Sequence, residues 1–444
     1  MHTNDIIVAP ATALGGAIAV IRISGEGSVE CCDRLFKGRK PLTEAKSHTI
    51  HYGTICDGER VVDDVVVAVF RAPHSYTGEE SVEISIHGSR YIASEVLRLL
   101  CEQGARMAEA GEFSQRALAA GRIDLSQAEA VADLIAAESR AAHAVAATQM
   151  RGGYSALLDE LREELLNITT LLELELDFSE EDVEFADRAK LRSMLENTDD
   201  AVVRLMESFK VGNAIREGVA VAIVGRPNVG KSTLLNRLVG DDRAMVSDVA
   251  GTTRDTIEES VVIDDIRFRF VDTAGLHDTD DKLEKMGIER TERAIRQAQI
   301  VLYMTEPQQS ELELELPELE EGQTLLLVVN KIDTSSKRDI EDAIYISARE
   351  GEGVDELRKA LRATVDTEGL YRGEVVVSNL RHFEALSRAH NDMTQAIAAL
   401  DYGISEELLA EDIRSAITAL AEITGRITND DILKNIFSHF CIGK

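Results

Sequence analysis

The stretch GRPNVGKST at residues 225–233 has the residue types and spacing of a phosphate-binding loop. Its two glycines, Gly225 and Gly230, are followed by Lys231 and Ser232, and an apolar run precedes it. Backbone N–H groups of such a loop and of the helix after it can surround phosphate oxygens. The lysine can reach the β and γ phosphates, and the serine hydroxyl can bind Mg²⁺. The spacing predicts a nucleotide site between a strand and a helix.

Three segments further along the chain indicate which nucleotide binds. The segment DTAG at 272–275 would bring a carboxylate near the metal and a glycine N–H near the γ-phosphate. In NKID at 330–333, Asp333 can accept hydrogen bonds from the ring N–H and the exocyclic amine of guanine. Adenine lacks this pair of donors, so ATP would leave a buried charge unpaired at a cost of about 1.5–3 kcal/mol. The segment SAR at 347–349 supplies a backbone donor for guanine O6. The sequence therefore predicts GTP, bound by Gly225, Asn228, Val229, Gly230, Lys231, Ser232, Thr233, Ser247, Thr252, Thr253, Asp272, Thr273, Ala274, Gly275, Asn330, Lys331, Asp333, Ser347, Ala348 and Arg349.

The residues available for hydrolysis differ from those of Ras-like proteins, which orient the attacking water with a glutamine directly after the DxxG glycine. Leu276 occupies that position, so the water must be oriented from elsewhere. Glu284, in DDKLEKMG, is a candidate, although an exposed glutamate at the start of a helix would give the same pattern. The side-chain oxygen of Asn228 is placed to hold a monovalent cation against the leaving group, where other enzymes use an arginine. Thr252 and Thr253 offer a hydroxyl for Mg²⁺.

Composition narrows the classes of protein that remain. The 444 residues carry a formal net charge of −32, which argues against a protein whose whole surface is basic and binds nucleic acid. Any contact with RNA must use a local basic patch. No apolar run approaches the roughly 20 residues of a membrane span, and the N-terminus lacks the features of a signal peptide. The five cysteines form neither a CxxC pair nor a zinc-binding spacing. We therefore expect a cytoplasmic protein with reduced thiols, no membrane association and no structural metal.

Glycine and proline divide the chain into segments of different character. At the N-terminus, runs of β-branched residues are interrupted by glycine and proline, which indicates a mixed α+β domain. No glycine lies between Gly153 and Gly212, which favours long helices there. Later, apolar strands alternate with helical stretches, as in a parallel sheet with crossover helices. The acidic stretch ELELELPELEE is interpreted as a solvated helix face or loop, or as an edge strand. We predict a multidomain α/β and α protein with a mixed α+β folate-binding-like domain at 1–118, a discontinuous helical domain at 119–215 and 369–444, and an inserted Ras-like P-loop GTPase domain at 216–368.

Taken together, these features closely resemble the MnmE (TrmE) family of tRNA modification GTPases. The likeness rests on GRPNVGKST, AGTTRD, DTAGL, VIRISG, SYTGEESVE, GRIDLSQAEA and the terminal FCIGK, and so spans nearly the whole chain. It implies a homodimer joined through the N-terminal domain, with hydrolysis driven by dimerisation of the GTPase domains across K⁺. It also implies an FAD-containing partner, MnmG, in a heterotetramer or larger complex. Such complexes modify C5 of the wobble uridine of certain tRNAs to an aminomethyl or carboxymethylaminomethyl derivative, with a carbon from 5,10-methylene- or 5-formyl-tetrahydrofolate.

The resemblance also assigns roles to single residues. Glu284 falls on the water-orienting glutamate of the family, and Mg²⁺ would be bound by Ser232 and Thr253. Potassium ligands would be Asn228, Ser247, Val249 and Thr252. Folate contacts would be Arg22, Glu83, Arg122 and Lys444, of which the first three would equally suit ion pairs at a surface or domain interface.

The last five residues, FCIGK, bring a thiol, Cys441, close to the chain terminus. Gly443 and Lys444 do not suit prenylation of a C-a-a-X box. A frayed tail is the default at a terminus. Against that default, the amphipathic segment DDILKNIFSHF can dock on the protein, and a thiolate is a strong nucleophile. The resemblance implies that Cys441 is needed for tRNA modification, with its chemical role open.

Two other functions are compatible with the GTPase motifs. The same domain would serve a regulatory or ribosome-assembly switch without tRNA-modifying chemistry, or a dimerisation scaffold with vestigial hydrolysis. Folate binding and a requirement for Cys441 distinguish the modifying enzyme from both.

Overall fold

The computed structural model describes residues 5–177, 188–243, 259–271, 284–307, 314, 316–335, 340–365, 374–402, 406–427, 430–438, 440 and 443. The chain divides into two compact units. The first comprises Met1–Ala132, Ser155–Asp159 and Leu420–Lys444, and the second comprises Asp133–Tyr154 and Glu160–Ala419.

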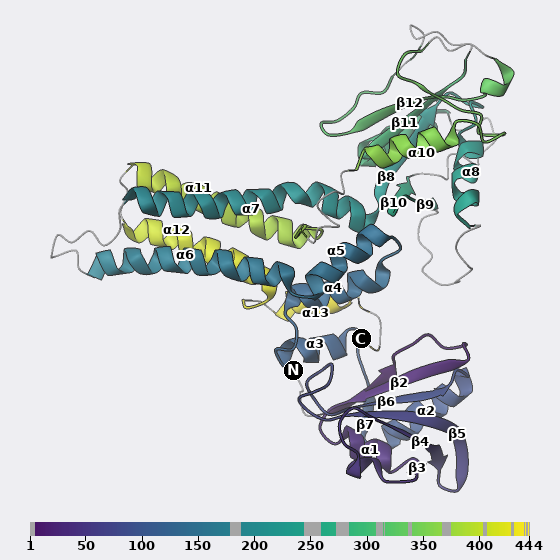
Figure 1. Ribbon diagram of the computed structural model, residues 1–444, viewed down its shortest axis with the longest axis vertical. Coiled ribbons are helices and arrows are strands. Elements are labelled where there is room, and N and C mark those ends of the chain that lie inside the picture. The colour runs from purple at the N-terminus through teal and green to yellow at the C-terminus, as the bar shows by residue number, and fades with distance from the viewer. Residues whose placement is uncertain are drawn as a thin grey trace. The chain divides into compact units, whose positions relative to one another are not determined.

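The first unit is built on a seven-stranded sheet in the order β3-β4-β5-β6-β2-β1-β7 (Figure 1). Its strands pair antiparallel, except that β1 pairs parallel with β7. The strands are β1 (Ile6–Pro10), β2 (Ile18–Ser24), β3 (Phe36–Gly38), β4 (Thr49–Asp57), β5 (Arg60–Phe70), β6 (Ser81–His87) and β7 (Ala105–Met107).

Alternation along the strands decides which face of this sheet is covered, because successive side chains point to opposite faces. In β5, Val65 and Val67 are buried, whereas Val66 between them is 40% exposed. The buried side chains form a core with residues of α1 (Ser28–Asp33) and α2 (Arg90–Glu102). The opposite face therefore carries exposed apolar side chains.

Three helices complete the first unit: α3 (Glu112–Ala119), most of α4 (Leu125–Ala136) and α13 (Asp430–Ser438). Phe437 of α13 is fully buried and packs with Phe440 against Leu125 and Ala128. Gly111 permits this packing, because a Cβ there would lie 2.9 Å from the Phe437 ring. The predicted amphipathic segment before the C-terminus therefore docks on the protein.

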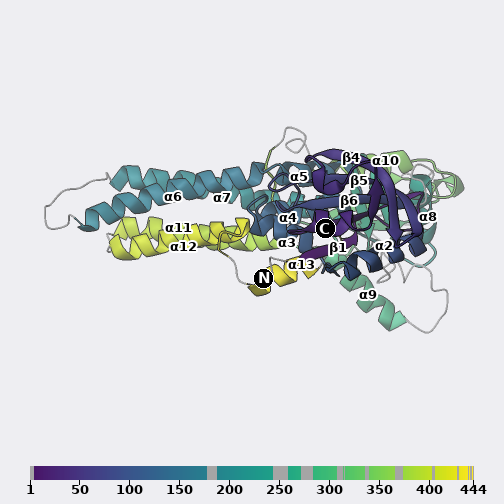
Figure 2. The same cartoon turned by 90° about the horizontal axis from the view of Figure 1, so that it is seen from below.

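The second unit contains long helices that run side by side (Figures 1 and 2). His390 of α11 bonds Asp199 of α7 at 2.7 Å, and Arg414 of α12 pairs with Glu173 of α6. The described residues between Gly153 and Gly212, a stretch that contains no glycine, lie in α6 and α7, as its sequence predicts. The helices of this unit are α5 (Arg140–Met150), α6 (Gly153–Asp177), α7 (Arg188–Glu217), α11 (Leu380–Tyr402) and α12 (Glu406–Thr424).

A six-stranded sheet in the order β13-β12-β11-β8-β10-β9 carries the nucleotide motifs. All its pairs are parallel except β9 with β10. The strands are β8 (Val219–Gly225), β9 (Glu259–Ile263), β10 (Ile266–Phe270), β11 (Ile300–Thr305), β12 (Thr324–Val329) and β13 (Ile344–Tyr345), and the helices are α8 (Lys231–Arg243), α9 (Glu284–Gln297) and α10 (Val354–Ala363). The chain changes direction across the sheet at β8, and ligands of such sheets bind beyond the carboxyl ends of the strands at this point.

The predicted fold class is confirmed: a mixed α+β N-terminal part, helices from separated segments, and an inserted P-loop sheet between them. The four domain boundaries stay a prediction, because the compact units group the helices differently. In the acidic stretch, Leu314 and residues 316–320 form no strand, which leaves the loop interpretation for these residues. No helix in the described ranges combines the length and apolarity that a membrane span requires.

Candidate functional site

The phosphate-binding loop lies between β8 and α8, as its spacing predicts. Gly225 has φ +145°, and a Cβ there would lie 2.3 Å from the carbonyl oxygen of Met304 in β11. Gly230 has φ +99°, and its Cβ would lie 2.3 Å from Nδ2 of Asn330. Both positions therefore require glycine, for conformation and for space. The loop ends where α8 begins, so the N–H groups of the first helical turn can bind an anion there.

Lys231 is the first residue of α8, and its ammonium group is held over the loop. Its Nζ donates to the carbonyl oxygens of Gly225 at 2.9 Å and Arg226 at 3.0 Å. Burial lowers the pKa of Lys231, because the charged form loses hydration. A phosphate anion in the loop would offset this penalty, so the site is electrostatically suited to a polyphosphate.

Asn330 ties the phosphate-binding loop to the segment predicted to meet the base. Its Nδ2 donates to the carbonyl of Val229 at 2.7 Å, and its Oδ1 accepts from the N–H of Ala348 at 2.9 Å. The side chain is only 3% exposed. Asp333 is fixed to the same segment, since its Oδ1 accepts from the Ser347 hydroxyl at 2.8 Å. The predicted phosphate and base contacts therefore form one connected site.

Lys331 supports the outer side of the loop. Its backbone is left-handed, with φ +67°, and its Nζ donates to the carbonyl of Asn228 at 2.7 Å and to Glu306 Oε1 at 2.5 Å. Asn228 is also left-handed, and its side chain is exposed. The amide oxygen of Asn228 accepts no hydrogen bond from the described residues, so it is available to a ligand.

Some of the predicted site residues lie in the described part of the chain and others do not. Ser232 and Thr233 are described and lie in the first turn of α8. Glu284 begins α9, but its side chain is not among those described. The predicted contacts Ser247, Val249, Thr252, Thr253, Asp272, Thr273, Ala274, Gly275, Cys441 and Lys444, as well as Leu276, lie outside the described residues.

The strand that leads into DTAG is tied to the helices of the second unit. In the turn between β9 and β10, the carbonyl of Asp265 accepts from the N–H of Ala141 at 3.2 Å. Arg267 of β10 pairs with Glu138 at 3.2 Å, and Arg140 pairs with Asp265 at 3.5 Å. These contacts join the β9–β10 hairpin to the connection between α4 and α5. A cavity of about 200 Å³ lies here, lined by Asp133, Ala136, Ala137, Ala142, Val145, Ala146, Arg216, Glu217, Arg267 and Ser378.

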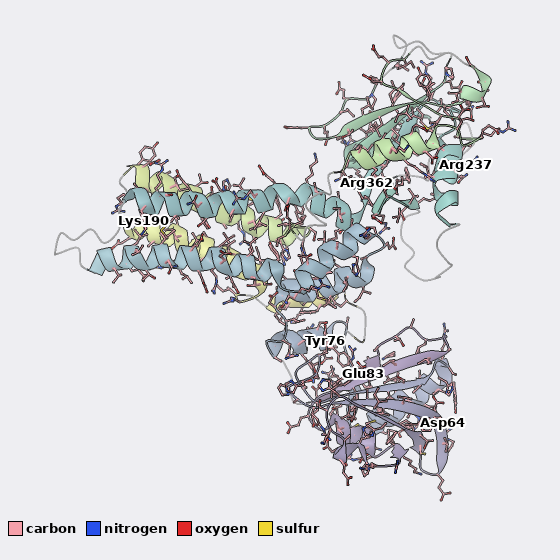
Figure 3. All side chains as sticks on the ribbon, in the orientation of Figure 1. Asp64, Tyr76, Glu83, Lys190, Arg237 and Arg362 are labelled. Carbon is pink, nitrogen blue, oxygen red and sulfur yellow. The ribbon has the colours of Figure 1, made fainter. Side chains whose placement is uncertain are left out.

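A second group of polar residues lies on the N-terminal sheet. Arg22 of β2 and Glu83 of β6 are directly opposite in the strand register, and their side chains pair at 2.8 Å. The guanidinium lies 5.5 Å from the Tyr76 ring centroid and 5.7 Å from that of Phe113. Figure 3 shows Tyr76 and Glu83 on the α3 side of the sheet. Arg122 is exposed, and its stem lies against the Gly78 position in the loop that carries Tyr76.

The end of the chain reaches this second group. Arg22 Nη1 donates to the carbonyl of Gly443 at 3.5 Å. Gly443 has φ +102°, and a Cβ there would lie 2.0 Å from the carbonyl oxygen of Pro10. With Phe440 packed beside α13, residues on both sides of Cys441 are held on the first unit. A frayed terminus, the default expectation, is therefore wrong for these residues.

Comparison with known proteins places this arrangement in a family. A family model described as the MnmE helical domain matches residues 125–441, and one described as the GTP-binding protein TrmE N-terminus matches residues 6–122. The tRNA modification GTPase MnmE of Bacteroides thetaiotaomicron is 48% identical over 464 residues, covering 99% of this chain and 100% of the relative. The chain belongs to the MnmE family of tRNA modification GTPases. The MnmE of Flavobacterium johnsoniae is 47% identical over 466 residues, with both chains covered completely. The FeoB G-domain from Methanococcus jannaschii is 26% identical over 33% of this chain and 96% of its own, with a TM-score of 0.25.

Within this MnmE-family site, the structure adds a residue that the motifs did not indicate. Arg237 of α8 donates to the carbonyl of Arg349 at 2.5 Å and to that of Ala348 at 3.4 Å (Figure 3). The Arg349 side chain itself is 83% exposed and pairs with Glu350. Arg237 therefore holds the backbone of the SAR segment. Only its place in the helix that follows the loop could have drawn attention to it.

Proposed function

We propose that this chain hydrolyses GTP with Mg²⁺ and, with an FAD-containing partner, modifies C5 of the wobble uridine of certain tRNAs. The carbon comes from a methylene- or formyl-tetrahydrofolate, and the reaction takes place in the cytoplasm. The observation that carries the proposal is Asn330, which joins the phosphate-binding loop to the base-binding segment through two hydrogen bonds. Family membership and the docking of the C-terminal residues beside Arg22 support the modifying role.

Mass spectrometry of tRNA nucleosides from a deletion strain tests the product directly. The strain is expected to lose the wobble modification and to regain it with the wild-type gene. A strain that carries the Cys441→Ser gene is expected to contain at least tenfold less modified wobble nucleoside than one with the wild-type gene. A hydroxyl is a far weaker nucleophile than a thiolate. Cys31→Ser is the matched control, since the Cys31 thiol is buried. Full modification with Cys441→Ser would instead favour a regulatory GTPase.

The cation in the GTPase reaction is proposed to be K⁺, bound by Asn228 and by carbonyls of Ser247, Val249 and Thr252. Glu284 would orient the water, and Ser232 and Thr253 would bind Mg²⁺. The amide group of Asn228 is exposed and its oxygen accepts no hydrogen bond from the residues that the structure describes, which supports the cation site. A cation there would supply the positive charge that an arginine finger supplies in other GTPases.

GTP turnover is expected to be at least tenfold faster in KCl than in NaCl at the same ionic strength. The larger K⁺ fits a site made of carbonyl oxygens better than Na⁺ does, and its charge stabilises the leaving phosphate. Asn228→Ala should lower the rate in KCl to the rate in NaCl. Equal rates of the wild type in the two salts would rule out the cation.

Folate is proposed to bind beside the Arg22 and Glu83 pair, with Arg122 and Lys444 as further contacts. A carboxylate opposite an arginine suits the ring of a pterin, and the basic residues suit its glutamyl tail. The neighbouring rings of Tyr76 and Phe113 supply flat apolar surface for stacking.

The protein is proposed to be a homodimer joined through the open face of the N-terminal sheet. On this face Tyr52, Val66, Ser85 and Val20 are opposite one another across four strands. Tyr52 is 70% exposed and Ile50 is 72% exposed. An apolar sheet face of this kind marks an interaction surface, and a second copy offers the same surface.

Tyr52→Glu is expected to raise the dimer dissociation constant at least 100-fold, because two charges would be buried at a symmetric interface. Sedimentation velocity over a concentration series measures the effect. Tyr402→Glu, at an 83% exposed tyrosine in the second unit, should leave the dimer intact. A Tyr52→Glu protein that stays dimeric at micromolar concentration would contradict the proposed interface.

A further inference from the structure

A cluster of positive charge occupies one edge of the N-terminal sheet. The segment RLFKGRKPLTEAK at 34–46 contains five lysines and arginines and one glutamate, in a chain with a formal net charge of −32. Four of its cations, which we call the basic edge, are all exposed: Arg34, Lys37, Arg39 and Lys40. They lie on and around β3, which is the terminal strand of the sheet (Figure 1).

Buried side chains hold the basic edge in place. Leu35 and Phe36 are 6% and 7% exposed, and Leu42 is fully buried. The carboxylate of Asp33 closes the loop by accepting from the N–H of Leu42 at 2.5 Å and from the Thr43 hydroxyl. The cations are therefore presented from a fixed backbone, so binding an extended ligand costs little ordering of the chain.

The four cations are not neutralised by carboxylates of the described residues. Lys37 donates to the carbonyl of Gly58 at 2.9 Å, which leaves its charge uncompensated. The nearby carboxylate of Asp57 is bound by Arg60 and Arg98. This sets the basic edge apart from the ion-paired arginines of the same unit, which in its described part are Arg22, Arg60, Arg71, Arg98, Arg106, Arg116 and Arg426.

A cluster of exposed cations without ion pairs to described residues suits the phosphates of a polyanion. Neutralising phosphates releases counterions, which supplies most of the affinity of proteins for nucleic acids. A lipid surface would also need apolar side chains to insert, but the apolar residues of this segment point into the core. The chemistry therefore favours a nucleic acid over a membrane.

We propose that the basic edge binds the phosphate backbone of the tRNA substrate. The inference rests on the proposed function for the identity of the RNA. The basic edge gives an acidic protein a local contact for a polyanion. We expect this contact not to depend on the RNA sequence, because its side chains are flexible cations and the segment exposes no aromatic ring that could stack on a base. The basic edge positions the RNA and takes no part in the chemistry.

The test is the salt dependence of binding between the full chain and an in vitro transcribed tRNA, with no nucleotide added. Arg39→Gln with Lys40→Gln should lower the slope of log K against log[KCl] by about 1.4 to 1.8, from roughly 0.7 to 0.9 per phosphate contact. If affinity at 1 M salt is unchanged, binding at 0.1 M KCl falls about 25- to 60-fold. Arg192→Gln with Arg414→Gln, at exposed arginines that already have ion pairs, removes the same charge and should leave the slope unchanged.

Each other outcome overturns the proposal. The Arg39 and Lys40 variant should unfold at the same temperature as the wild type. If the slope for this folded variant is unchanged, the RNA binds elsewhere. An equal loss in both double variants would show that only the overall charge matters. Binding of the wild type to phosphatidylserine vesicles but not to the transcript would assign the basic edge to a membrane. Loss of the basic edge alone leaves the proposed function intact. A wobble uridine that stays fully modified in the deletion strain would instead remove that function, whatever the slope.

Discussion

Asp333→Asn is expected to lower the affinity for GTP by at least 100-fold and to create affinity for xanthosine triphosphate. The carboxylate is proposed to accept from two donors of guanine, and each charge-assisted hydrogen bond would contribute about 1.5–3 kcal/mol. An asparagine amide would place a donor against one of those donors. Xanthine carries a carbonyl oxygen where guanine has its amine, so the same amide donates to xanthine. Because 1.4 kcal/mol is a factor of ten, the change in preference should exceed 100-fold.

Competition between the two nucleotides for a fluorescent analogue measures this change. Asp333 Oδ1 also accepts from Ser347, and an asparagine oxygen can still do so, which preserves the segment. Asp355→Asn is the control, since Asp355 is 82% exposed on α10. If Asp333→Asn kept its preference for GTP, the base would have to be recognised by a different residue.

The elements that carry the nucleotide motifs could be predicted from the sequence because each motif is local. The glycines, Lys231 and the first turn of α8 are consecutive in the chain, so their spacing alone specifies a loop that binds phosphate. Asn330 and Asp333 follow the apolar strand β12, and parallel strands bring such ends to one edge of a sheet. The structure confirms the strand, loop and helix order at each of these positions.

Contacts between distant residues could not be predicted in the same way. Arg237 reaches the carbonyl of Arg349, 112 residues away, and nothing in its local sequence differs from a surface arginine. Arg22 contacts Gly443 across 421 residues. Such pairs depend on how whole elements pack, and a pattern of 3.6 or 2 residues carries no information about their partners.

The acidic stretch at 311–321 illustrates a different limit. Alternating glutamate and leucine satisfies the period of a strand, yet the described residues from 316 to 320 form none. Period alone does not supply a neighbouring strand, and an unpaired segment gains nothing from an extended conformation. β5, whose sequence has no such alternation, is a strand because β4 and β6 pair with it on either side.

Lys231→Ala is expected to lower kcat/KM for GTP by about 1000-fold. Lys231 is the first residue of α8, and two carbonyl oxygens already hold its ammonium group at 2.9 and 3.0 Å. It therefore needs no reorganisation when charge develops on the phosphates, which is the property that makes such groups effective. Removing a single preorganised donor costs 10²–10³ in rate, and the lost attraction for the ground-state triphosphate adds to this.

Steady-state hydrolysis in KCl measures the loss, and titration with a nonhydrolysable GTP analogue separates binding from chemistry. Lys231→Arg should recover less than a tenth of the activity, because a planar guanidinium cannot occupy the position of a compact ammonium between two carbonyls. Lys190→Ala, at an exposed lysine near the start of α7, is the matched control (Figure 3). A Lys231→Ala protein with normal turnover would mean that the loop does not hold the reacting phosphates. The connection through Asn330 would then be only structural.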